Sequence, residues 1–172
     1  MPLGTTALRG LLEGNPVSGL DGDSSWLRAE PEILLIRLAD LELHPDWERW
    51  LLRAVVLRDA DAKVIGHCGM QGPPEDGRVD IGYTIAPAWR RMGFASEATA
   101  ELTDYAAQTG EVTRVRLCIA PSNIASQGVA RKLGFLATGT RWDDVDGEEL
   151  TFERVVGPNR SFAATTLRSG RS

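Results

Sequence analysis

The alternation of apolar and polar residues is clearest between residues 50 and 86. The segments WLLRAVVLRD (50–59) and KVIGHCGM (63–70) are rich in β-branched and apolar residues and flank DADA (59–62), a turn-forming stretch. This order predicts an antiparallel hairpin. VDIGYTIA (79–86) predicts another strand. One face of that strand carries Val79, Ile81, Tyr83 and Ile85, and the other carries Asp80, Gly82 and Thr84.

Helical spacing appears twice in the second half of the chain. FASEATAELTDYAAQTG (94–110) is rich in alanine and ends at a glycine, and SNIASQGVARKLG (122–134) has a polar start and also ends at a glycine. Strands and helices mixed in this way predict a single α+β (mixed α/β) domain over residues 1–156. Three further strands are predicted at TRVRLCIA (113–120), FLATGTRW (135–142) and EELTFERVV (148–156), the last two joined by the turn DDVDG.

The first 49 residues have a weaker pattern. TTALRGLLEG (5–14) has helical spacing, and the proline and glycines of NPVSGLDGDSS (15–25) interrupt it. WLRAEPEILLIRLADLEL (26–43) has apolar residues without a clean period, so a short helix and an early strand both fit. At the other end, the polar and basic residues 157–172 predict a flexible tail.

Composition limits the partners. The 172 residues include 24 Asp and Glu against 19 Lys and Arg, a net charge of −5, which excludes a broad nucleic-acid-binding face. No run approaches the roughly 20 apolar residues that cross a bilayer, so we expect a cytoplasmic protein with no membrane partner. Cys68 and Cys118 stand in apolar segments without metal-site spacing, so we expect buried, inert thiols and no bound metal.

The segment WRRMGFASEA (89–98) combines two arginines, a glycine and a helix start. The first amides of a helix have no intrahelical partner and carry partial positive charge, which favours anions. Gly93 permits close approach of a ligand to the backbone, and Arg90 and Arg91 add full charges suited to phosphate oxygens. The loop therefore fits a pyrophosphate. On the alternative reading, the glycine only eases a turn and the arginines are solvated.

Three motifs resemble the GNAT acyltransferase superfamily. RRMGFA (90–95) matches its Arg/Gln-x-x-Gly-x-Gly/Ala signature, and NIASQGVARKLGF (123–135) is similar to its second signature, Asn-x-x-Ser-x-x-hydrophobic-x-x-Lys-Leu-Gly-Phe. VIGHCGM (64–70) resembles the family's Ile-Gly strand. The pattern is most similar to the branch that contains ribosomal-protein N-terminal acetyltransferases. The resemblance implies a central, mostly antiparallel, splayed β-sheet flanked by helices, with acetyl-CoA as co-substrate and no metal.

The resemblance also implies a binding mode for acetyl-CoA. Backbone groups of Tyr83, Thr84 and Ile85 would pair with the pantetheine arm, where their strand diverges from the strand at 113–120. Asn123 would bond the amide region of the same arm. The pyrophosphate would rest on the amides of Arg91, Met92, Gly93, Phe94, Ala95 and Ser96, with side-chain charge from Arg90 or Arg91.

Amine acetylation needs a proton donor for the departing thiolate and an acceptor for the proton of the amine. The resemblance places Ser126 near the thioester sulfur as the donor; as an alternative, its hydroxyl bonds the backbone at its own helix start. Asp80 is the first candidate base, and a structural ion pair with an arginine is the alternative. His67 is the second candidate, and a satisfied core histidine is the alternative.

Together these features indicate an N-acetyltransferase that moves an acetyl group from acetyl-CoA to a primary amine by direct attack in a ternary complex. The acceptor is either a protein N-terminus or a small amine, and the acidic surface favours a cationic one. The alternative function is a catalytically weak or inactive acyl-CoA-binding sensor or interaction module. Dimerisation is common among relatives, so a homodimer is a further partner to test.

The resemblance divides the domain into an acceptor-side region, residues 1–49, and an acetyl-CoA-binding core, residues 50–156. Trp26, Trp47 and Trp50 lie at or near the first region, where most are expected in the core and one or two along the amine pocket. The branch usually opens with a strand of the form RLxLRPL, which this chain lacks. Either EILLIRLA (32–39) takes its place or that strand is lost.

Overall fold

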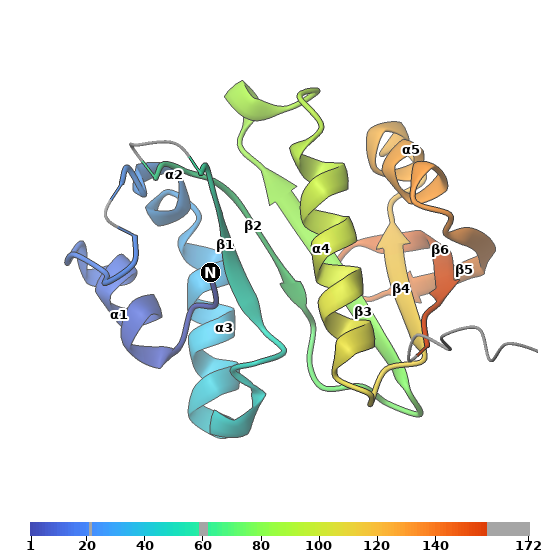
Figure 1. The fold of residues 1–172 in the computed structure, drawn as a ribbon, viewed down its shortest axis with the longest axis horizontal. Coiled ribbons are helices and arrows are strands. Elements are labelled where there is room, and N and C mark those ends of the chain that lie inside the picture. Colours follow the sequence, from blue (N-terminus) through green and yellow to red (C-terminus); the bar gives the residue numbers. More distant parts are fainter. Residues whose placement is uncertain (21, 59–61, 158–172) are drawn as a thin grey trace, which may run out of the picture.

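The computed structural model describes residues 1–20, 22–58 and 62–157, so most of the predicted turn at 59–62 and of the predicted tail lies outside the described residues. Figure 1 shows the arrangement of the elements. The helices are α1 (Thr5–Glu13), α2 (Ser25–Arg28), α3 (Pro31–Leu43), α4 (Phe94–Gln108) and α5 (Ile124–Lys132), with short 3-10 helices at Pro45–Trp47 and Pro87–Trp89. The strands are β1 (Leu52–Val56), β2 (Val64–Met70), β3 (Arg78–Ile85), β4 (Arg114–Ile119), β5 (Leu136–Asp143) and β6 (Gly147–Val155).

The strands form one six-stranded sheet in the order β1-β2-β3-β4-β6-β5. Its neighbouring strands are antiparallel except β3 and β4, which are parallel because α4 connects them as a crossover. The parallel pairing covers only Arg78–Asp80 and Arg114–Arg116, and beyond it the two strands diverge (Figure 1). The predicted mixed α/β domain with a mostly antiparallel, splayed sheet is therefore confirmed.

Two hydrophobic clusters cover opposite faces of the sheet. On one face, Leu102 and Ala106 of α4 pack with Val79 and Ile81 of β3. On the other face, leucines of α1–α3 pack against β1, whose Ala54 is buried among them. Period-two alternation separates the faces, because neighbouring residues of a strand point to opposite sides. The sheet thus lies between α4 and the N-terminal helices at its β1–β2 end.

The segment 26–43, for which helix and strand both fitted the sequence, is helical. Pro31 at the first position of α3 pre-sets a helical φ angle, and Leu34 and Leu41 are buried. Leu35 and Ile36 remain more than half exposed, which explains why the sequence showed no clean period. EILLIRLA is therefore part of a helix and does not replace the family's opening strand. Backbone bonds instead tie Met1 and Leu3 to the outer edge of β1.

Both predicted hairpins are confirmed. β1 and β2 are antiparallel neighbours, as are β5 and β6. In the second hairpin, Asp143 Oδ1 accepts bonds from the amides of Val145 and Asp146, at 2.9 and 3.0 Å, and Gly147 has a φ of +78°. Such side-chain bonds to a turn backbone are the reason that aspartate and glycine favour turns. Residues close together in the sequence therefore determine the turn between β5 and β6.

Candidate functional site: the β3–α4 loop and the start of α5

The loop between β3 and α4 leaves the helix start open. Arg91 and Gly93 both have left-handed backbones, with φ of +61° and +93°, and Gly93 is the N-cap of α4. The first helical bond runs from Glu97 N to Gly93 O at 3.1 Å. A left-handed N-cap suits glycine, because other residues adopt that conformation only with strain. The backbone conformation at position 93 therefore favours glycine.

Six amides at this position have no hydrogen-bond partner among the described residues. They belong to Arg91, Met92, Gly93, Phe94, Ala95 and Ser96. A Cβ built on Gly93 would meet nothing within 4 Å, so the space beside this glycine is open. Unbonded amides at the positive end of the dipole of a 15-residue helix are an arrangement that favours anions.

The two arginines of the loop differ. The Nε of Arg90 donates to Ile85 O at 2.9 Å, so this side chain lies along the end of β3. Arg91 is exposed and has no ion pair among the described residues. Arg90 therefore has a structural role in holding the loop, and Arg91 is the more available cation for a phosphate.

β3 and β4 open a gap beside this loop. Asp80 O accepts from Gln71 N and Ala86 N donates to Ile65 O, so the even-numbered residues of β3 bond toward β2. By alternation, the backbone groups of Thr84 also face β2, and those of Tyr83 and Ile85 face the gap. Tyr83 and Ile85 are thus placed to bond an extended ligand there, and Thr84 is placed on the other side.

Asn123 and Ser126 meet at the start of α5. Asn123 is the N-cap, and its Oδ1 accepts the Ser126 amide at 3.1 Å. The alternative reading of the sequence, a bond from the Ser126 hydroxyl to its own backbone, is not among the hydrogen bonds of the described residues. Ser126 is half-buried, and its hydroxyl donates no hydrogen bond to another described residue. The hydroxyl is therefore free to serve another group.

Tyr83 has a feature that the sequence did not reveal. Its hydroxyl oxygen is buried and has no hydrogen-bond partner among the described residues. Burial raises the pKa of Tyr83, and the neighbouring Ser126 side chain opposes that rise. The two hydroxyls are therefore close but not in bonding geometry. Sequence reasoning assigned Tyr83 only a backbone role, because β3 and α5 meet only in the folded chain.

Asp80 lies where β3 and β4 separate, and it is held by two arginines. Arg116 donates from Nε to Oδ1 at 2.8 Å and from Nη2 to Oδ2 at 2.6 Å, and Arg141 approaches Oδ2 at 3.4 Å. The side chains of Asp80 and Arg116 are 15% and 18% exposed. Arg141 also donates to Glu149 at 2.7 Å. The ion pair considered as the alternative role for Asp80 is thus present. Asp80 can accept a proton only if a hydrogen bond from Arg116 opens.

Of the remaining candidates, Trp26, Trp47 and His67 lie on the sheet face opposite α4, and Trp50 belongs to the cluster on the α4 face. A cavity of about 260 Å³ is lined by Trp47, Asp80 and Arg116, among others. Trp50 is buried in the core. His67 stacks on Trp26 with ring centroids 5.9 Å apart, and burial, assisted by the charge of Arg37, lowers the pKa of His67 to about 4. The environment of His67 is that of a half-buried, neutral histidine.

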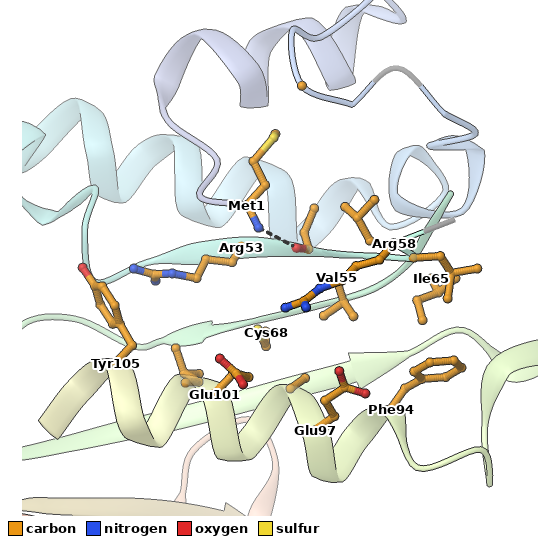
Figure 2. A pocket seen from close by; sticks show the side chains of 16 residues that line it. Met1, Arg53, Val55, Arg58, Ile65, Cys68, Phe94, Glu97, Glu101 and Tyr105 are labelled. Atoms are coloured by element: carbon orange, nitrogen blue, oxygen red, sulfur yellow. Dashed lines mark hydrogen bonds between the residues drawn. The ribbon is translucent and has the colours of Figure 1, made fainter. Parts of the chain in front are cut away.

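A larger cavity, about 680 Å³, lies on the α4 side of β1 and β2 (Figure 2). Glu97 and Glu101 rise from α4 toward this groove, and Arg53 and Arg58 extend into it from the β1 side. Of the residues predicted to bind acetyl-CoA, only Phe94 lines it. The groove between β1 and α4 is therefore distinct from the gap between β3 and β4.

The described residues contain no group of three or more His, Cys, Asp or Glu side chains that could hold a metal ion. No described helix is long and apolar enough to span a bilayer. Cys68 is buried and Cys118 half-buried, both free. Burial raises the pKa of both thiols, that of Cys118 to about 11, so both are protonated near neutral pH.

Comparison with known proteins decides the family. The family model described as an acetyltransferase (GNAT) domain matches residues 21–136, more than half of the chain. The chain belongs to the GNAT family. The match includes the β3–α4 loop and the start of α5, so the two GNAT signatures lie in the segments that form the site described above.

Relatives by sequence include the uncharacterized N-acetyltransferase p20 of Bacillus licheniformis, 32% identical over 101 residues, which cover 58% of this chain and 54% of p20. YdaF of Bacillus subtilis, named as a candidate ribosomal N-acetyltransferase, is 31% identical over 108 residues, which cover 58% of this chain and 56% of YdaF. The chain spans about half the length of these relatives. Among solved structures, the ribosomal L7/L12 α-N-protein acetyltransferase RimL, in complex with coenzyme A, has a TM-score of 0.61 at 16% identity, covering 90% of each chain. That likeness supports the fold.

Proposed function

We propose that the protein transfers an acetyl group from acetyl-CoA to a primary amine. The observation that carries this proposal is the row of unbonded amides from Arg91 to Ser96, which lies beside the gap between β3 and β4. A pyrophosphate on these amides would direct an extended arm along Tyr83 and Ile85 toward Asn123 and Ser126. The open space beside Gly93 fits such a ligand.

Each residue has one proposed task. The amides of the loop and Arg91 neutralise the diphosphate charge. Gap-facing backbone groups of Tyr83 and Ile85 hold the pantetheine arm, and Asn123 bonds it through its amide nitrogen, because its Oδ1 is used as the helix cap. Acetyl-CoA supplies an activated thioester, whose carbonyl carbon the neutral amine attacks as the carbon–sulfur bond breaks. The hydroxyl of Ser126 then donates to the departing sulfur.

Asp80 remains the proposed proton acceptor, with a condition set by its surroundings. Both of its oxygens accept bonds from Arg116, so the carboxylate becomes basic only when one of these bonds opens or when a water molecule bridges to the amine. Its position at the point of strand separation, beside the cavity lined by Trp47, supports this role. We place the acceptor amine in that cavity. Trp47, which lines it, belongs to the proposed acceptor-side region, residues 1–49.

The acceptor is a protein N-terminus or a small amine, and the net charge of −5 favours a cationic one. A cytoplasmic location and a homodimer belong to the same proposal. The solved structures with this fold include a spermidine N-acetyltransferase chimera from Vibrio cholerae and hSSAT, at 16% identity and a TM-score of 0.63, covering 90% of this chain and 93% of that one. Both acceptor classes therefore belong in the test.

The test is acetylation of an amine panel that contains polyamines and peptides with free N-termini. Products are detected by mass spectrometry, because it identifies directly which amine has gained an acetyl group. We expect acetyl-CoA to bind and at least one amine to gain an acetyl group. Binding without turnover on any amine would favour the alternative, an acyl-CoA-binding module. Absence of binding would contradict both functions.

A further inference from the structure

Tyr83 contains a buried polar atom whose environment is incomplete. Its hydroxyl oxygen is shielded from solvent, and it is the one buried side-chain nitrogen or oxygen without a hydrogen-bond partner in the described part of the chain. Buried hydroxyls are nearly always bonded, since an unmade bond destabilises the folded state. A phenylalanine would pack the same ring without that cost. The hydroxyl therefore calls for an explanation outside the packing of the core.

The neighbour of this hydroxyl is Ser126. The ring of Tyr83 packs against the main core cluster, which includes Ala130 one turn farther along α5. Ser126 is close enough to influence the ionisation of the phenol, although the two oxygens do not form a hydrogen bond here. The backbone of Ser126 is fixed by the Asn123 cap, whereas its hydroxyl hydrogen rotates freely. A small rotation of the serine side chain would complete the pair.

We propose that Tyr83 is a positioning residue for Ser126: the phenol donates to Ser126 Oγ and thereby turns the serine hydrogen toward the sulfur of the departing thiolate. The inference rests on the proposed acetyl transfer and adds a residue to it. A serine oxygen that accepts from one side directs its own proton to the other. No bond of Tyr83 breaks, and no group is oxidised or reduced.

The acidities of the groups limit both hydroxyls to hydrogen bonding, because the aliphatic hydroxyl of Ser126 is an even weaker acid than the phenol of Tyr83. Burial raises the pKa of Tyr83 above its usual value of 10, whereas an ordinary thiol has a pKa of about 8.5. Net transfer of the phenol proton to the thiolate would therefore be unfavourable. A hydrogen bond carries no such requirement, and cooperative chains of hydroxyls strengthen the last bond in the chain.

The experiment compares Tyr83→Phe, Ser126→Ala and the double variant with the wild type. Tyr83→Phe keeps the ring, so we expect an unchanged or higher Tm, unchanged acetyl-CoA affinity by calorimetry, and kcat lower by roughly three- to tenfold. Because Tyr83 acts through Ser126, the double variant should be no slower than Ser126→Ala. Tyr105, the other tyrosine of the chain, provides the matched control: Tyr105→Phe should leave kcat unchanged.

The outcomes separate this inference from the proposed function. Wild-type kcat in Tyr83→Phe, with active wild-type enzyme, overturns the inference alone. Effects of the two substitutions that multiply in the double variant also overturn it, because they would show that Tyr83 acts independently of Ser126. A fall in acetyl-CoA affinity in place of kcat would mean that the hydroxyl holds the coenzyme. Absence of acetyl-CoA binding and turnover in the wild type would overturn the proposed function and the inference together.

Discussion

Replacing Gly93 by alanine separates ligand binding from folding. Gly93 is the N-cap of α4 with a φ of +93°, and no protein atom lies within 4 Å of the position of its missing Cβ. Gly110, just beyond the other end of the same helix, has a φ of +74° and an equally open surrounding. Gly110→Ala is therefore a matched control. The 15 residues of α4 place the two glycines more than ~20 Å apart.

The structure sets the size of both effects. A left-handed alanine costs about 1–2 kcal/mol of folding free energy, so both variants should lose a similar amount. Only at Gly93 would the new methyl group lie beside the loop amides, where the proposed diphosphate binds. A charge-assisted hydrogen bond is worth about 1.5–3 kcal/mol, so displacement from two amides costs about 3–6 kcal/mol of binding. Affinity for coenzyme A should fall roughly a hundredfold or more.

Calorimetric titration with coenzyme A and thermal unfolding are the two measurements. We expect a similar decrease in Tm for both variants, with weakened binding only in Gly93→Ala. If Gly93→Ala bound coenzyme A within about twofold of the wild type, the diphosphate would not lie against this loop. Equal loss of affinity in both variants would mean that general destabilisation, and not the site, controls binding.

Two further predictions concern the sheet face opposite α4. The pKa of His67 is about 4 in the folded state and 6.5 in the unfolded state. Between these pH values the unfolded state binds more protons. The free energy of unfolding therefore falls by up to about 3 kcal/mol as the pH drops from 6.5 to 4. In His67→Gln, the free energy of unfolding measured by urea denaturation should fall less over that pH range. The same dependence on pH as in the wild type would refute the lowered pKa of His67. Asp80→Asn should lower the free energy of unfolding by about 2 kcal/mol, because it leaves Arg116 poorly paired. The control Glu42→Gln, which removes an exposed ion pair with Arg9, should change it little. Equal effects of the two substitutions would contradict a stabilising role for the Asp80–Arg116 pair.

Local signals explain how much of the fold and loop the sequence predicted. The glycine and alanine spacing of the β3–α4 segment and the turn residues of the β5–β6 hairpin act over a few residues, so they could be identified without tertiary information. The helical state of 26–43 could not be decided. Its apolar residues are distributed around α3, with Leu34 buried and Leu35 exposed, and packing against α1 determines the outcome.

Long-range register explains what the sequence did not predict. Asp80 pairs with Arg116 because the short parallel contact of β3 and β4 sets these residues opposite one another. The sequence offered an arginine partner only as an alternative, without naming it. Tyr83 and Ser126 likewise meet only when α5 packs against the sheet. Alternation correctly assigned the side-chain faces of β3, but not which of its backbone groups face β2.

The central claim is that acetyl-CoA binds along the β3–α4 loop and the start of α5. Titration of ¹⁵N-labelled protein with acetyl-CoA, followed through its amide NMR signals, tests this most directly. We predict the largest shifts at the amides from Arg91 to Ser96, with further shifts at Tyr83, Ile85 and Ser126. Shifts confined to the groove between β1 and α4, for example at Val55, with the loop amides unmoved, would contradict the account.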